Sequence, residues 1–143
     1  MTTVKPPFWF WVVAVVLLLW GLIGFGGFVA DRMMSPSQLA QMSDYDRRLY
    51  TDRPAWTIWA YGLATATGLL GAVLLLVRRG LARPVWIASL IFVVLLFGYI
   101  LSATDIIAVK GFLAAAGFPI VLAAIGVFQI WVTGLALRRG WIA

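Results

Sequence analysis

Long apolar segments alternate with short polar segments along the whole chain. Each of the longest segments lacks Asp, Glu, Lys and Arg, and is long enough to cross the ~30 Å hydrocarbon core of a bilayer as a helix. These segments are residues 8–30, 55–77, 85–104 and 111–137. Helix is the expected state because each segment must satisfy its own backbone hydrogen bonds in lipid. The pattern predicts an all-α integral membrane protein with four transmembrane helices, arranged as two hairpins, with a short helical loop at residues 31–54.

The first apolar segment has one feature of a secretory signal peptide, because Lys5 precedes it. It is longer than the apolar region of such a peptide. In addition, Phe28 stands where a small residue would be needed before a cut after Ala30. We therefore expect this segment to be retained as a span.

The composition of the 143-residue chain agrees with a single membrane domain over residues 1–143. Hydrophobic residues make up 64% of the chain and charged residues 11%, against about 45–50% and about 25% in soluble domains. The net charge of +6 comes from short basic clusters between the spans rather than from one basic face, which argues against nucleic-acid binding. Lipid is therefore the expected environment.

Candidate catalytic chemistry is scarce in this chain. It has no Cys and no His, which excludes disulfides, thiolate catalysis, haem ligation by these residues and most zinc sites. The one adjacent acid–base pair outside the long loop, Asp105 with Lys110, is expected to be a surface ion pair in a tight turn. We therefore expect no enzymatic activity, no catalytic residue, no metal and no cofactor.

Tryptophan and glycine residues mark the ends of the spans. Spans two and four end in Arg-Arg-Gly, and Gly80 and Gly140 suit the left-handed residue that often closes a helix. Trp20 and Trp131 lie deeper and are expected to pack between helices. The remaining tryptophans lie close to span ends and are expected in the interfacial belts: Trp9, Trp11, Trp56, Trp59, Trp86 and Trp141.

The distribution of basic residues predicts the orientation. An even number of spans places both termini on one side of the membrane. That side carries six Lys and Arg residues, and the opposite side carries five together with all five aspartates. Residues 78–83 alone contain three arginines. The positive-inside rule, which counts Lys and Arg in short loops, places both termini in the cytoplasm.

The loop at residues 31–54 is the only long polar segment. Ser35 followed by Pro36, and Ser43 followed by Asp46, are typical of helix starts. The loop is either a docking surface for a partner or, as the favoured alternative, a connector with solvated charges. Asp44, Asp46 and Asp52 form only a weak candidate for a cation site, because arginines stand beside them. The candidate docking residues are Asp44, Asp46, Arg47, Arg48 and Arg53.

Polar residues within the spans are few and uncharged. Gln129 is expected to form a hydrogen bond to a neighbouring helix, although it could instead touch a polar solute. Pro119 should kink span four or mark a late helix start. Small residues four apart predict close helix packing, within the chain or with another chain, and the selected positions are Gly62, Ala66, Gly68 and Ala72.

Several boundary motifs resemble those of a group of small bacterial inner-membrane proteins with four predicted spans. The motifs are Lys5-Pro6-Pro7-Phe8-Trp9, Met33-Met34-Ser35-Pro36, Arg48-Leu49-Tyr50 followed by Pro54-Ala55-Trp56, and the closing Arg-Gly-Trp-Ile-Ala. The resemblance covers nearly the whole chain and implies a multi-pass protein of the bacterial inner membrane. Members of the group sometimes carry a sugar-transporter label. A sugar site would need several convergent polar groups, however, and Gln129 is nearly alone.

Two functions remain for such a chain. The first is a non-catalytic accessory or structural subunit, bound to other membrane subunits or to copies of itself. The alternative is a small-molecule transporter or channel that acts as an oligomer. A polar stripe along one helix face would favour the alternative, and Tyr61, Thr65 and Gly68 form a faint stripe of this kind.

Overall fold

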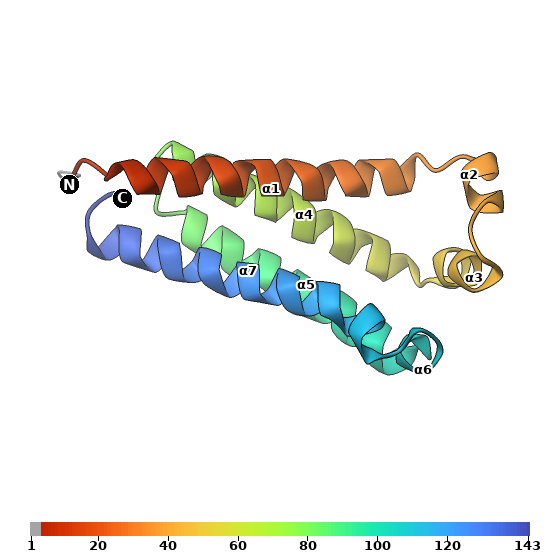
Figure 1. Ribbon diagram of the computed structural model, residues 1–143. Coiled ribbons are helices and arrows are strands. Elements are labelled where there is room, and N and C mark those ends of the chain that lie inside the picture. The colour runs from red at the N-terminus through yellow and green to blue at the C-terminus, as the bar shows by residue number, and fades with distance from the viewer. Residues whose placement is uncertain (1–3) are drawn as a thin grey trace.

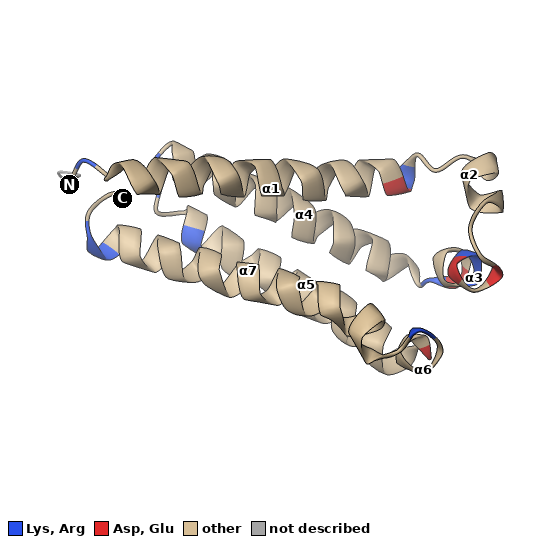
Figure 2. Cartoon of the chain, in the orientation of Figure 1, with Lys and Arg blue, Asp and Glu red and all other residues tan. Residues whose placement is uncertain are grey.

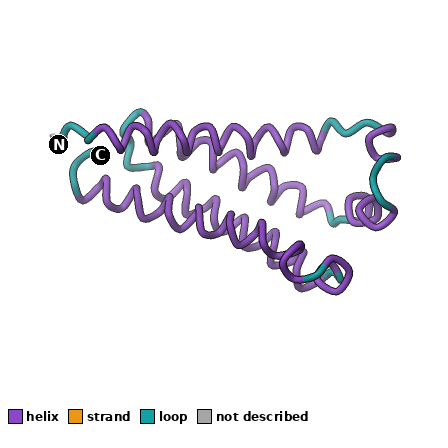
Figure 3. Tube along the Cα trace, viewed as in Figure 1, coloured by secondary structure: helices purple, strands orange, loops and turns teal. Residues whose placement is uncertain are grey.

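The protein is an array of long antiparallel helices. The computed structural model describes residues 4–143, and within them it contains helices but no strands (Figures 1 and 3). Four helices are long and apolar enough to cross a membrane. They are α1 (Phe8–Arg32), α4 (Ala55–Leu76), α5 (Ala82–Ala103) and α7 (Phe112–Arg138). The predicted all-α fold with four spans is confirmed.

Three short helices connect the spans at one end. The loop after α1 contains α2 (Pro36–Ala40) and α3 (Asp44–Asp52), and α6 (Ile106–Lys110) joins α5 to α7. Ser35 accepts a hydrogen bond from the Gln38 N–H and Ser43 accepts one from the Asp46 N–H. Both predicted helix starts in the loop are therefore confirmed. We call this end of the molecule the loop end, and the opposite end the terminal end (Figure 1).

The long helices pack in an open order. α1 packs on α4, α4 on α5, and α5 on α7, whereas α1 and α7 share no extensive contact. α1 and α7 therefore form the two edges of the array rather than closing it into a ring. Charged residues lie at the two ends of the molecule and leave the long helices apolar between them (Figure 2).

Glycine permits close approach at two seams. A Cβ at Gly62 would lie 2.8 Å from the Phe28 ring of α1, and a Cβ at Gly71 would lie 2.3 Å from the Trp86 ring of α5. Both distances are too short for real side chains, so these helices approach closely only because glycine stands there. Gly68 and the buried Ala72 also face neighbouring helices. Ala66 is exposed, so its packing role would need another molecule and stays a prediction.

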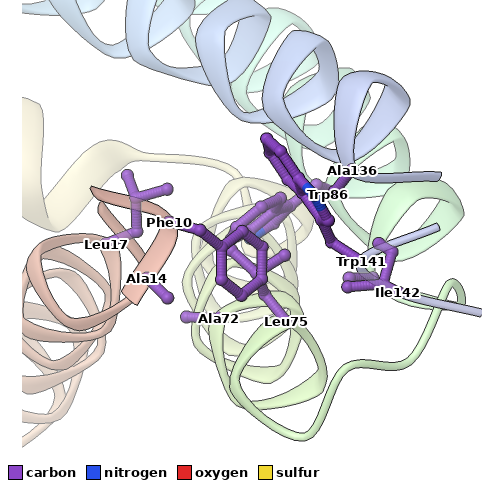
Figure 4. Packing of buried hydrophobic residues seen from close by; sticks show 10 residues of the cluster. Phe10, Ala14, Leu17, Ala72, Leu75, Trp86, Ala136, Trp141 and Ile142 are labelled. Carbon is purple, nitrogen blue, oxygen red and sulfur yellow. The ribbon is translucent and has the colours of Figure 1, made fainter. Parts of the chain in front are cut away.

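A buried aromatic cluster fills the terminal end (Figure 4). Trp86 is fully buried and donates its Nε1–H to the Gly68 carbonyl over 2.9 Å. Trp141 packs edge-on against the rings of Trp9 and Phe10. The expectation that Trp86 and Trp141 belong to interfacial belts is therefore wrong, because each ring finds a slot between helices. Trp131, expected between helices, is instead 53% exposed on the outer surface.

The two ends of the chain are joined by hydrogen bonds through Arg78. This residue has a φ of 62°, so it takes the left-handed conformation that was expected of Gly80. Its guanidinium donates to the carbonyls of Trp141 and Val4, each over 2.7 Å, and these bonds offset the backbone strain. Gly140 does have the expected left-handed conformation, with a φ of 73°.

Pro119 lies inside α7, which begins at Phe112. The late helix start is therefore wrong. Gly111, with a φ of 87°, turns the chain from α6 into α7.

Candidate functional site

A cavity of about 1050 Å³ lies between the long helices and reaches the loop end. Residues of α1, α4, α5 and α7 line it, with α3 and α6 at its outer end. Because α1 and α7 do not pack together, the cavity is open along the side between them. At the terminal end the aromatic cluster fills the space between the same helices, so the cavity stops inside the membrane-spanning region.

The wall of the cavity is mainly apolar in the middle of the array. Its apolar side chains come from α1, α5 and α7 and include Ile23, Leu90, Val93, Phe118, Leu122 and Ile125. α4 contributes the faint polar stripe, since Tyr61, Thr65 and Gly68 all line the cavity. The Thr65 hydroxyl already donates to carbonyls of its own helix. Such a wall suits a molecule that is itself largely apolar.

Gln129 lies at the deep end of the cavity. The residue is only 6% exposed, and it lies about 25 Å along α7 from Phe112 at ~1.5 Å per residue. No side-chain hydrogen bond joins it to any residue between 4 and 143, so the expected bond to a neighbouring helix is not formed. Every fully enclosed polar side-chain atom of these residues has a partner. The Gln129 amide therefore reaches the cavity that it lines.

A pair of contacts holds α3 over the outer end of the cavity. Tyr45 donates its hydroxyl to Asp105 Oδ1 over 2.8 Å, and Lys110 Nζ lies 2.5 Å from Asp46 Oδ1. We call these two contacts the latch. The hydrogen bond from Lys110 lowers the pKa of the Asp46 carboxyl below its ordinary range. The expected ion pair between Asp105 and Lys110 is wrong, because each of them instead binds a residue of α3.

Two arginines of the candidate docking set stabilise the loop itself. Arg47 donates to the carbonyls of Leu39, Ala40 and Met42 and also pairs with Asp44.

Arg53 forms two bonds to the Asp31 carboxylate, of 2.8 and 3.2 Å, and lies over the Tyr50 ring. These bonds fix the loop to the end of α1.

Arg48 differs from the other basic residues of this set. Its side chain is exposed and forms no ion pair or hydrogen bond within residues 4–143. Docking through this loop stays a prediction, and within residues 4–143 Arg48, whose guanidinium lies 6.0 Å from the centre of the Tyr45 ring, is the basic residue of the set without an ion pair. Asp44, Asp46 and Asp52 do not converge, since the described part of the chain contains no cluster of three carboxylates suited to a metal ion.

Sequence reasoning did not foresee the cavity. The one available signal was the stripe on α4, together with the amide of Gln129 at a similar depth on α7. Neither feature could show that α1 and α7 stay apart, which is what creates the space between them.

The fold and its surface define the class: this is a four-span helical membrane protein whose long apolar helices contact the lipid bilayer. Comparison with protein-family models, with curated proteins and with solved structures gives no match.

Proposed function

We propose that this four-span protein is non-catalytic and binds a small, membrane-soluble molecule in the cavity between α1 and α7. The observation that carries the proposal is the shape of the cavity. It is open along one side, toward the space that lipid occupies, and it stops at the aromatic cluster of the terminal end. A ligand can therefore enter sideways from the bilayer without passing through water.

This geometry supports small-molecule binding more than a continuous channel. A channel would need an open path to the terminal end, where Phe10, Trp86 and Trp141 belong to one buried hydrophobic cluster. Transport would require that cluster to separate in a second conformation. Ligand binding by itself requires no such change. The proposal therefore includes binding of a small molecule and leaves out its transport across the membrane.

Two glycines of α1 provide a matched test of ligand binding. Gly24 lines the cavity, and a Cβ there would meet only the Thr65 methyl at 3.8 Å, whereas a Cβ at Gly26 would meet nothing within 4 Å. A ring at position 24 should fill the space between α1 and α4, and the same ring at position 26 should face outward.

The experiment is native mass spectrometry of the protein extracted gently from its own membrane. Wild type and Gly26→Phe should carry a bound small molecule of fixed mass, and Gly24→Phe should have lost it. Retention of that molecule by Gly24→Phe, or a wild-type protein without any bound molecule, would contradict the proposal.

Assembly with other membrane subunits, or with copies of itself, is a second proposal. Small residues on the outward surface favour it, since Gly26 and Gly98 have open space above them and Ala66 is exposed. Such positions allow another helix to approach closely. The same native spectra test it, because a larger complex of fixed stoichiometry supports an accessory subunit and a lone monomer contradicts it.

We further propose that the membrane is the bacterial inner membrane and that both termini face the cytoplasm. The basic residues of the terminal end support this orientation, because Arg78, Arg79 and Arg83 lie in one short connection. The loop end, with α2, α3 and α6, then faces the opposite side.

A further inference from the structure

The Gln129 amide is a polar group without a protein partner deep in an apolar cavity. The residue is only 6% exposed, and its side chain forms no hydrogen bond within residues 4–143. Because no fully enclosed polar side-chain atom of these residues lacks a partner, the amide must face the space of the cavity that it lines. Burying an amide without a hydrogen bond costs free energy, so buried polar groups in native proteins nearly always have partners. The missing partner of this amide is therefore a molecule that enters the cavity.

The neighbouring polar groups cannot replace that molecule. Ser89 donates its hydroxyl to the Ala64 carbonyl over 2.7 Å, and the Trp86 Nε1–H is bound to Gly68. Thr133, one turn further along α7, donates to carbonyls of its own helix. The Gln129 amide has N–H donors and a carbonyl acceptor. Compared with Ser89, Trp86 and Thr133, it is the group whose donors are free to bind a ligand.

The charges around the cavity indicate how a ligand lies in it. The charged residues of its lining belong to the loop end, namely Asp46, Arg48, Asp52, Arg53, Asp105 and Lys110. The deep end contains none of these charges, so the group that meets Gln129 should be neutral. A phospholipid with its headgroup at the loop end would bring only hydrocarbon to Gln129 and would leave the amide unsatisfied.

We propose that the cavity selects a neutral membrane-soluble molecule whose apolar body carries a carbonyl or hydroxyl oxygen, and that this oxygen is the end bound by Gln129. The inference rests on the proposed function, because it needs a ligand in the cavity. The Gln129 N–H donates to a carbonyl, and its own carbonyl accepts from a hydroxyl. Gln129 is then the residue that determines which apolar molecules are retained.

The test compares two probes that differ in oxygen content. A decyl-substituted para-benzoquinone and decylbenzene are added at equal mole fraction to lipid nanodiscs that contain the full chain. Bound probe is measured by native mass spectrometry. Wild type should prefer the quinone by about 3- to 30-fold, the factor expected from one hydrogen bond inside a membrane protein. Gln129→Met, which keeps the side-chain length, should bind both probes alike.

Thr133→Val is the matched control on the same helix, and it should keep the full preference because Thr133 is bound to its own backbone. Equal binding of both probes by wild type, or a preference that survives in Gln129→Met, would overturn the inference while leaving ligand binding intact. Failure of the wild type to bind either probe would overturn both the inference and the proposed function.

Discussion

Single small residues decide how closely the helices approach. The Trp86 ring lies in the space above Gly71, where a Cβ would come within 2.3 Å of the ring. That slot also directs the indole N–H to the Gly68 carbonyl, so the ring is both packed and hydrogen-bonded. In membranes, where no hydrophobic force joins helices, such close packing supplies much of the attraction between them.

Replacing Gly71 by Ala should therefore weaken the α4–α5 seam. The added methyl group would force Trp86 out of its slot, and overpacking of this kind costs about 1–3 kcal/mol. Gly98→Ala is the matched control, because a Cβ there meets nothing within 4 Å. Thermal unfolding in detergent should show a lower midpoint for Gly71→Ala and an unchanged or slightly higher midpoint for Gly98→Ala. Equal midpoints would show that the seam tolerates the methyl group.

At the scale of elements, the latch joins two connections that are remote in sequence. α3 belongs to the first hairpin and α6 to the second, and Tyr45–Asp105 and Asp46–Lys110 are their polar contacts. Both contacts are partly exposed to water, so each contributes modestly to stability. Their effect should be local, on the position of α3 over the cavity, rather than on the stability of the whole array.

The latch should lose one of its two contacts at each extreme of pH. The pKa of Asp46 is lowered by its bond to Lys110, so the contact is complete above the ordinary value of 3.8 and is lost as pH falls through the lowered pKa. Partial removal from water and the bond to Asp105 raise the pKa of Tyr45 above its ordinary 10.0. The tyrosine contact is therefore complete below that value and is lost as pH rises through the raised pKa.

Spin labels on introduced cysteines can follow this loss of contact, because the chain has no cysteine of its own. Labels at Asp52→Cys and Val109→Cys, both exposed, should give one narrow distance distribution near neutral pH and a broad one in strong acid. Adding Asp46→Asn should broaden the distribution near neutral pH as well. A narrow distribution at every pH would mean that apolar packing, rather than the latch, holds α3 in place.

For the whole molecule, the open order of helices and the closed terminal end together shape the cavity. Hydrogen bonds from Arg78 to both ends of the chain hold the terminal end together. At the loop end, α1 and α7 are free to lie apart, because their connections run through α3 and α6 rather than directly between them. The result is a pocket that is closed at one end only.

The orientation of this pocket in the membrane can be tested with single cysteines. Ser37 lies at the loop end and Lys5 near the terminal end, and both are exposed. If both termini are cytoplasmic, a membrane-impermeant maleimide added to intact cells should label Ser37→Cys and not Lys5→Cys. Permeabilised cells should show labelling of both variants. Labelling of Lys5→Cys alone in intact cells would reverse the orientation.

The fold class, the spans and the caps of the loop helices could all be predicted from the sequence. The reason is that these features depend on local properties, namely uninterrupted apolar length, serine caps and the need to satisfy the backbone in lipid. The predicted and observed ends of the spans differ by at most three residues, with the largest shift at the start of α5, at Ala82 instead of Val85.

Which side chains contact one another could not be predicted in this way, because those contacts depend on how the helices pack. Trp86, near the start of α5, is fully buried, whereas Trp131, well inside α7, is 53% exposed, although burial between helices was expected of Trp131 and not of Trp86. Gln129 has no hydrogen bond to a neighbouring helix because Trp86 and Ser89 of α5 are bound to α4 carbonyls and α1 does not pack on α7. In a chain that is apolar all round, periodicity does not mark the inward face. The cavity, the latch and the uncommitted amide therefore follow from helix packing and from contacts between residues far apart in sequence.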